Sequence, residues 1–149
     1  MGPDHLALFI SVRPRFAELL LNGQKTVELR RVQPAVTRGT LVLLYASSPV
    51  CALVGTGSID DIQVSAHDDI WCRHGERTGI SRDEYDDYFE GATAAVAITL
   101  TSVRPLPRPV PLRELRQGRK WFRPPQSFRY LNRHQIASFG MPMPDPTLI

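Results

Sequence analysis

The sequence has few cysteines, no long apolar run and none of the common phosphate-loop or nucleophile motifs. Two cysteines among 149 residues are too few for a disulfide framework, and no apolar stretch approaches the roughly 20 residues that a membrane-spanning helix needs. No basic and then apolar leader precedes the first apolar run, so we expect a cytoplasmic protein with no membrane partner. A glycine-rich phosphate loop, a nucleophile elbow and a paired-carboxylate motif are also missing. The absence of these motifs argues against the common classes of nucleotide-hydrolysing and acyl-transfer enzymes.

A single folded domain fits the length and composition. Hydrophobic residues make up 42% of the chain and charged residues 22%, which is near the average of globular domains and argues against wholesale disorder. The chain has no internal repeat and no linker, so we predict one domain over residues 1–149. Residues 1–5 and the proline-rich residues 141–149 are expected to be loosely ordered.

Lysine is scarce, since 16 of the 18 basic residues are Arg, and the charge is unevenly distributed. Residues 1–56 carry 6 basic and 3 acidic side chains, residues 57–96 carry 3 and 10, and residues 97–149 carry 9 and 2. Two basic parts thus flank an acidic middle, an asymmetry that favours nucleic-acid binding. Arginine binds phosphate through two parallel hydrogen bonds, although an arginine-rich genome explains the same bias.

Apolar and alternating segments predict five strands and several short helices. The run from Lys25 to Arg30 alternates and predicts a half-exposed strand. Gly55 and Gly57 mark a bulge or bend. The proline-rich segment 104–111 is predicted to be extended and unable to join a central ladder. The predicted strands cover residues 6–12, 25–30, 41–46, 52–59 and 94–103, and the predicted helices begin at Pro14, after Ser65, after Ser81 and at Leu112.

These elements predict an α+β fold. Short connections and bend-marking glycines favour a small curled mixed β-barrel of about five to six strands with flanking helices. A doubly wound sheet is disfavoured, because the alternation of strand and helix that it requires occurs only once, at the start of the chain.

One candidate site lies on the predicted strand that contains Lys25, Glu28 and Arg30. Strand alternation places Thr26, Glu28 and Arg30 on the polar face, where a carboxylate and nearby cations can hold an anion and orient a base. The alternative is an ordinary surface ion pair worth at most about 1 kcal/mol. Spacing alone leaves both interpretations open.

Two further candidate groups combine arginine, aromatic and hydroxyl side chains. The segment 123–131 interleaves arginines with aromatic residues, which is typical of single-strand binding surfaces, although Phe128 and Leu131 would equally plug the end of a barrel. The strand end at 45–49 offers hydroxyls for phosphate contact or forms a tight Ser-Pro turn. The candidate residues in these groups are Ser47, Ser48, Gln126, Ser127, Arg129 and Tyr130.

The sequence predicts neither a metal site nor a cofactor. Cys72 and His74, with His67 nearby, lack the fuller set of spaced ligands on which zinc sites depend. A lone Cys beside Trp71 is usually a core residue. These residues are therefore weak candidates for any chemistry.

The segments NGQKTVELRR, YASSP and PPQSFRYL, with the SVRP opening of the first helix, resemble the ASCH family of small PUA-like domains. The most diagnostic part is the Gly-x-Lys-x-x-Glu-x-Arg pattern that begins at Gly23, and the likeness covers nearly the whole chain. The resemblance implies a curled β-barrel with flanking helices and a cleft into which Lys25, Glu28 and Arg30 project. The family is associated with binding of RNA or DNA, and with transcription coactivation, RNA metabolism or translation.

The family also includes enzymes, so the resemblance implies an alternative. Some bacterial members deacetylate cytidine acetylated on its exocyclic amine, with a Lys, a Thr and a Glu. Lys25 matches that Lys, whereas Glu28 stands three residues later, where the Thr would lie. A single-strand ribonuclease activity is also associated with the family, and it would use the same basic cleft with Glu28 as general base. In either metal-independent reaction Lys25 and Glu28 would be the catalytic residues.

The combined prediction is a monomeric or weakly dimeric nucleic-acid-binding module, with a small hydrolase as the alternative. Arg13, Lys25, Arg30 and Arg129 would contact phosphate, and Glu28 would orient these cations or a base edge. The acidic helices in the middle of the chain are expected to face away from the cleft, and a protein-interaction domain built on them is a third interpretation. The other expected cleft residues are Ser47, Ser48, Gln126, Ser127 and Tyr130.

Overall fold

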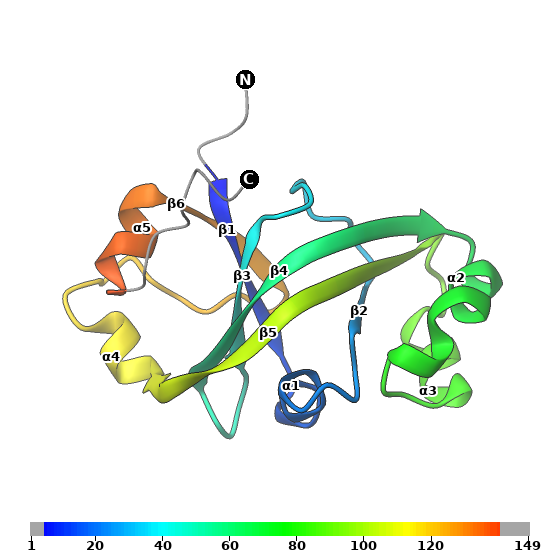
Figure 1. Cartoon of the computed structure of the whole chain (residues 1–149), viewed down its shortest axis with the longest axis horizontal. Helices are drawn as coiled ribbons and strands as arrows, with labels where there is room; N and C mark the ends of the chain where they lie inside the picture. The colour runs from blue at the N-terminus through cyan, green and yellow to red at the C-terminus, as the bar shows by residue number, and fades with distance from the viewer. Residues whose placement is uncertain (1–4, 141–149) are drawn as a thin grey trace.

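A computed structural model of the protein describes residues 5–140 and contains one sheet surrounded by short helices (Figure 1). The strands are β1 (His5–Val12), β2 (Val27–Arg30), β3 (Leu41–Ala46), β4 (Ala52–Ser65), β5 (Ala95–Pro111) and β6 (Phe128–Asn132). The helices are α1 (Pro14–Leu21), α2 (His67–His74), the short η1 (Gly75–Arg77), α3 (Arg82–Tyr88), α4 (Leu112–Arg116) and α5 (Arg133–Ser138). The prediction of loose order falls on residues 1–4 and 141–149, which lie outside the described residues, and on His5, which begins β1.

The strands form a mixed sheet in the order β2-β5-β4-β3-β1-β6. β1 pairs parallel with β3, and the other neighbours pair antiparallel. The long β4–β5 ribbon curves across the molecule, with α2 and α3 at one end and α4 at the other (Figure 1). The α+β class and the curled sheet with flanking helices are confirmed. Closure into a barrel is not, because β2 and β6 remain the two edges of the sheet within residues 5–140.

The sheet carries a core on each face, because its central strands are apolar on both sides. Leu8 and Ile10 of β1 pack with Leu20 of α1 in one core, whereas Phe9 packs with Phe122 in the other. A third cluster joins β2 and β5 to α2 and α3. This third cluster fixes α3 near β2.

β5 is longer than the sequence predicts, because the proline-rich segment 104–111 continues the strand and pairs with β4. β2 pairs only with Val96–Thr99 of β5, so the second half of β5 has no neighbour on that side among the described residues. Proline has no backbone N–H to donate to a neighbouring strand. The prolines are tolerated here because one side of this part of β5 is an open edge, where no such hydrogen bond is required. Register shifts in β4 at Gly55 and Gly57 confirm the predicted bulges.

β2 is buried at every position and not half-exposed as predicted. Val27 and Leu29 pack into the cluster with α2 and α3, as alternation requires. The other face is also covered, although it carries Glu28 and Arg30. These two charges can be buried because they pair with each other, which alternation alone does not show.

Three of the four helix starts agree with the sequence. Pro14 opens α1, Leu112 opens α4, and the Ser81 hydroxyl caps α3 by accepting a hydrogen bond from the Glu84 amide at 3.2 Å. Ser65 does not cap α2, whose N-cap is Ala66 without a side-chain hydrogen bond. β6 and α5 were not located by the sequence analysis, although six strands lie within its predicted range. No helix within residues 5–140 is long and apolar enough to cross a bilayer.

Candidate functional site

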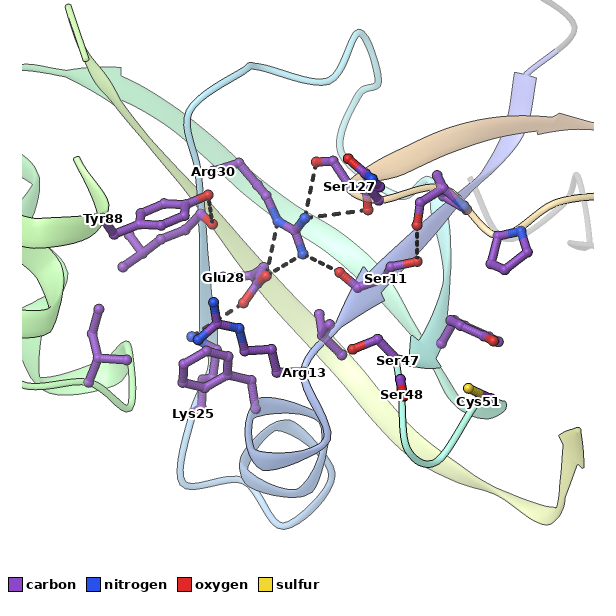
Figure 2. A pocket seen from close by; sticks show the side chains of 18 of the residues that line it. Ser11, Arg13, Lys25, Glu28, Arg30, Ser47, Ser48, Cys51, Tyr88 and Ser127 are labelled. Carbon is purple, nitrogen blue, oxygen red and sulfur yellow. Dashed lines mark hydrogen bonds and ion pairs between the residues drawn. The ribbon is translucent and has the colours of Figure 1, made fainter. Parts of the chain in front are cut away.

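A cleft of about 900 Å³ opens where β1, β2 and β3 end, between α3 on one side and the chain before β6 on the other (Figure 2). The start of α1 forms its floor in this view. Because the cleft collects residues from β1, β2, β3, α1, α3, α4 and several loops between them, no short motif describes it. The predicted site residues that line it are Arg13, Lys25, Glu28, Arg30, Ser47, Ser48, Gln126 and Ser127.

The centre of the site is a buried ion array of Lys25, Glu28 and Arg30. The Arg30 guanidinium donates to Glu28 Oε2 through Nε at 3.0 Å and through Nη2 at 2.5 Å. The Lys25 ammonium lies 3.3 Å from Glu28 Oε1 and donates to the Thr78 carbonyl at 2.5 Å. All three residues are 7% exposed or less. One carboxylate therefore holds two cations in fixed positions, and an ordinary surface pair is excluded.

Burial lowers the pKa of Lys25, because the charged ammonium loses its hydration. The neighbouring Glu28 opposes this effect, both by its charge and by a hydrogen bond. The Lys25 ammonium also lies 4.9 Å from the centre of the Phe16 ring, a cation–π contact. Lys25 is thus a cation that gives up its proton more readily than an exposed lysine does.

Arg30 also ties β2 to β1 and to the chain that precedes β6. Its guanidinium donates to the Ser11 carbonyl at 2.8 Å and to the Ser127 hydroxyl oxygen at 3.1 Å. The Ser11 hydroxyl in turn donates to the Pro125 carbonyl at 2.7 Å. Ser127 accepts from Arg30 and makes no other side-chain bond in the described structure, so its own proton remains available to a ligand.

Arg13 differs from the other two cations of the cleft, because it is exposed and its guanidinium has no partner among the described residues. It lines the same cleft as Lys25 and Glu28, whose side chains it overlaps in the view of Figure 2. The cleft is lined by three cations and three carboxylates, the carboxylates being Glu28, Glu84 and Asp87. Its formal charges cancel, and Arg13 is the cation that remains free to bind an anion.

The end of β3 and the turn after it form the opposite rim. Tyr45 is 3% exposed, and burial together with the neighbouring Cys51 raises its pKa to about 12, so its hydroxyl stays protonated. Ser47 and Ser48 lie on the turn, and their hydroxyls have no hydrogen-bond partner among the described residues. This rim therefore offers hydroxyl donors across the cleft from the ion array.

Two predicted site residues, Arg129 and Tyr130, do not line the cleft. The Arg129 guanidinium stacks over Trp121, 5.4 Å from the ring centre, on the other face of the sheet. The Tyr130 hydroxyl accepts from the Ala35 amide at 2.8 Å. Adjacent residues of a strand point to opposite faces of the sheet. The place of Ser127 in the cleft therefore does not predict where the side chains of Arg129 and Tyr130 lie. Leu131 of the same segment is fully buried, in agreement with the alternative that it packs in the core.

The expectation that the acidic helices face away is wrong for α3. Glu84, Asp87 and Tyr88 of α3 line the cleft, and Glu84 pairs with Arg15 of α1 at 2.5 Å. The sequence contains a pattern that predicts this orientation, because the aromatic residues Tyr85 and Phe89 lie one helical turn apart. Both are buried in the structure. Their burial turns the adjacent positions of the helix toward the cleft. Ser11 is a further lining residue outside the predicted groups, and Tyr45, which begins the candidate segment 45–49, lines the cleft as well.

The residues weighed for a metal site are dispersed in the structure. His67 pairs with Asp86 at 2.6 Å, and His74 bonds Gln63 at 2.7 Å. Cys72 is exposed, not a core residue as expected. Residues 5–140 contain no group of three or more His, Cys, Asp or Glu side chains that could hold a metal ion.

Comparisons with known proteins identify relatives along most of the chain. An ASCH domain-containing ribonuclease from Zymomonas mobilis is 35% identical over 133 residues, which are 89% of this chain and 89% of that protein. The crystal structure of ASCH from Zymomonas mobilis superposes with a TM-score of 0.85 at 32% identity, over 91% of this chain and 94% of that one. The large ribosomal subunit protein uL22 of Ureaplasma parvum is 28% identical over 125 residues, 83% of this chain but 39% of that protein.

The ASCH domain model matches residues 10–104, which include the ion array and the rim at the end of β3. The match excludes the chain before β6, so Gln126 and Ser127 join the site from outside the matched residues. The family match and the relative that aligns with most of the chain agree with the resemblance seen in the sequence. The chain belongs to the ASCH domain family.

Proposed function

We propose that this ASCH protein binds single-stranded RNA in the cleft and cleaves it there. The observation that carries the proposal is that one unpaired arginine, Arg13, lines the same cleft of about 900 Å³ as the fixed array of Lys25, Glu28 and Arg30. A relative that aligns with 89% of the chain is named a ribonuclease, which supports cleavage and not binding alone.

The cleft offers separate contacts for a phosphate and for the bases beside it. Arg13 and the hydroxyls of Ser127, Ser47 and Ser48 have donors to spare and would hold phosphate oxygens. Tyr88 is 40% exposed and would stack an unpaired base. Because stacking needs a base that is splayed out of a helix, these contacts favour a single strand over a duplex.

The reaction that fits these residues is attack of a ribose 2′-oxygen on the adjacent phosphorus. The new bond closes a 2′,3′-cyclic phosphate, and the bond to the 5′-oxygen of the next nucleotide breaks. In this proposal Lys25 acts as the neutral amine, the form that burial favours, and takes the 2′-hydroxyl proton to become the ammonium that Glu28 holds. The leaving 5′-oxygen takes its proton from water at the open mouth. Arg13 would stabilise the charge that develops on the phosphate.

Glu28 alone is a poorer general base than the sequence predicts. Its two oxygens already face Lys25 and Arg30, so its role in the proposal is to fix both cations. Acetylcytidine deacetylation finds less support. Glu28 occupies the position of the catalytic Thr in those enzymes, and Thr26 does not line the cleft.

The experiment is digestion of a 5′-labelled single-stranded RNA, with a DNA strand of the same sequence as the matched substrate. We expect the RNA to be cut to products that end in a 2′,3′-cyclic phosphate, and the DNA to remain whole because it lacks the 2′-hydroxyl. Lys25→Met should abolish cutting and keep binding, whereas Arg13→Ala should weaken binding. Arg38→Gln, outside the cleft, is the control, and thermal melts verify that each variant is folded.

Three outcomes separate the alternatives. Binding of RNA with no cutting by the wild type would leave a binding module and reject the ribonuclease. Cutting of RNA and DNA alike would reject the 2′-oxygen mechanism. If the wild type neither binds nor cuts RNA, the proposal as a whole fails.

A further inference from the structure

The cleft contributes no net charge toward a polyanion. Its three cations are matched by three carboxylates, and two of the cations, Lys25 and Arg30, are held by Glu28. Phosphate neutralisation supplies much of the affinity of proteins for nucleic acids. Cations outside the cleft are therefore needed to hold a strand that is longer than the cleft.

The two side walls of the cleft differ in charge. On one side α3 (Arg82–Tyr88) contains four carboxylates and one arginine. On the other side residues 112–129, which include α4, contain six cations and one carboxylate, Glu114. α3 and α4 lie at opposite ends of the β4–β5 ribbon (Figure 1). A phosphate backbone that leaves the cleft meets repulsion on one side and attraction on the other.

On the basic side, four cations are exposed and their side chains have no hydrogen bond or ion pair with any described residue. These are Arg113, Arg116, Lys120 and Arg123, of which the last three follow the lining residue Leu112 toward Pro124. The other cations of this stretch are occupied: Arg119 donates to carbonyls at the end of α4, and Arg129 stacks over Trp121.

These free cations continue directly from the lining of the cleft. Leu112 lines the cleft, and Arg116 lies one helical turn further on the same face of α4. Arg116 is near enough to Tyr45 for its charge to oppose the rise in the pKa of that phenol. Arg123 directly precedes Pro124, another lining residue.

Building on the proposed function, we infer that a bound RNA strand leaves the cleft on the α4 side, where Arg116, Lys120 and Arg123 form a basic track for its backbone. The strand does not cross α3. The cleft then selects the nucleotides that react, and the basic track supplies affinity that depends on the length of the strand.

The test compares oligouridylates of about three and about twelve nucleotides, since single-strand binding sites have this range of sizes. The variant Arg116→Gln/Arg123→Gln removes two cations of the track. The control Arg38→Gln/Arg73→Gln removes two exposed cations elsewhere, so both proteins have the same net charge. Binding of the longer RNA is measured by fluorescence anisotropy between roughly 50 and 200 mM KCl. Binding of the shorter RNA is measured by displacement.

We expect the track variant to bind the longer RNA on the order of tenfold more weakly at low salt, with a log-log salt slope smaller by about 1.4, or about 0.7 for each lost phosphate contact. Binding of the shorter RNA should not change. A further variant, Asp83→Asn on α3 and outside the cleft lining, should bind the longer RNA no more weakly than wild type.

Each contrary result has a defined meaning. If the track variant binds the longer RNA as wild type does, or if the control loses as much affinity, the track is refuted while the cleft stands. If both RNAs lose affinity equally, the arginines act within the cleft, and the inference is wrong. If the wild type binds neither RNA, the proposed function fails first.

Discussion

Replacing Glu28 with Gln tests whether the ion array stabilises the fold. Glu28 and its partners Lys25 and Arg30 are almost completely buried. Removing the carboxylate charge leaves two buried cations without a counter-charge, and breaking a buried pair in this way costs about 3–5 kcal/mol. For a domain of this length each kcal/mol lowers the melting temperature by about 2–4 °C, so we expect a fall of roughly 6–20 °C.

The matched control is Glu84→Gln, the same chemical change at a carboxylate that is 46% exposed and pairs with Arg15, itself 55% exposed. An exposed pair of this kind contributes little to stability. Urea denaturation monitored by tryptophan fluorescence measures the free energy of unfolding of both variants. Equal losses in the two variants would refute the reasoning, as would a Glu28→Gln protein as stable as the wild type.

A pH series makes the same test more specific. The pKa of Lys25 is lowered in the folded protein, so between that value and 10.5 the unfolded chain binds more protons. Stability therefore rises as pH increases through this window. Glu28 opposes the lowering, so Glu28→Gln should move the window to lower pH, and part of its deficit should disappear as pH is raised. Lys25→Met/Glu28→Gln should lack this recovery.

Three further predictions concern binding, pH and packing. Arg13→Ala should reduce the salt slope of RNA binding by about 0.7, measured by anisotropy, because one phosphate contact is lost. Burial, with help from Arg77, lowers the pKa of His74, so stability should fall as pH drops below 6.5, and His74→Gln should flatten this dependence in urea melts. A Cβ at Gly55 would lie 2.7 Å from a backbone oxygen of β5, so Gly55→Ala should cost about 1–3 kcal/mol, and more than Gly57→Ala, whose nearest contact is a side-chain methyl at 3.2 Å.

The sequence predicted the strands whose apolar runs are unbroken, because burial on both faces of the sheet requires such runs. It failed where charged or proline-containing segments are ordered by a neighbour. Residues 104–111 form a strand because one edge is open, and β2 is buried because Glu28 and Arg30 neutralise each other. Both outcomes depend on pairing partners far away in the chain, which a local pattern does not contain.

The candidate site, too, was predicted from the sequence only in part. The order of Lys25, Glu28 and Arg30 in the sequence located the centre of the site, but their exposure was predicted wrongly. Arg129 was grouped with Ser127 by composition, yet strand alternation sends it to the opposite face, where it stacks on Trp121. The net charge of the acidic segment predicts that α3 lies away from the site. The buried Tyr85 and Phe89, one helical turn apart, instead turn α3 toward the cleft.

The internal pairing of charge in the cleft has a consequence for its function. Lys25 and Arg30 are held by Glu28 before any ligand arrives, so they need not reorganise when a phosphate binds beside them. The same pairing leaves little net attraction for a long polyanion. Under the proposed function such a site would separate two tasks, since its fixed buried charges would orient the reacting group and exposed cations outside it would supply the affinity. The exposed cations of the proposed track lie on the α4 side, so the direction in which a strand would leave the cleft follows from the placement of the acidic helix α3 on the other side.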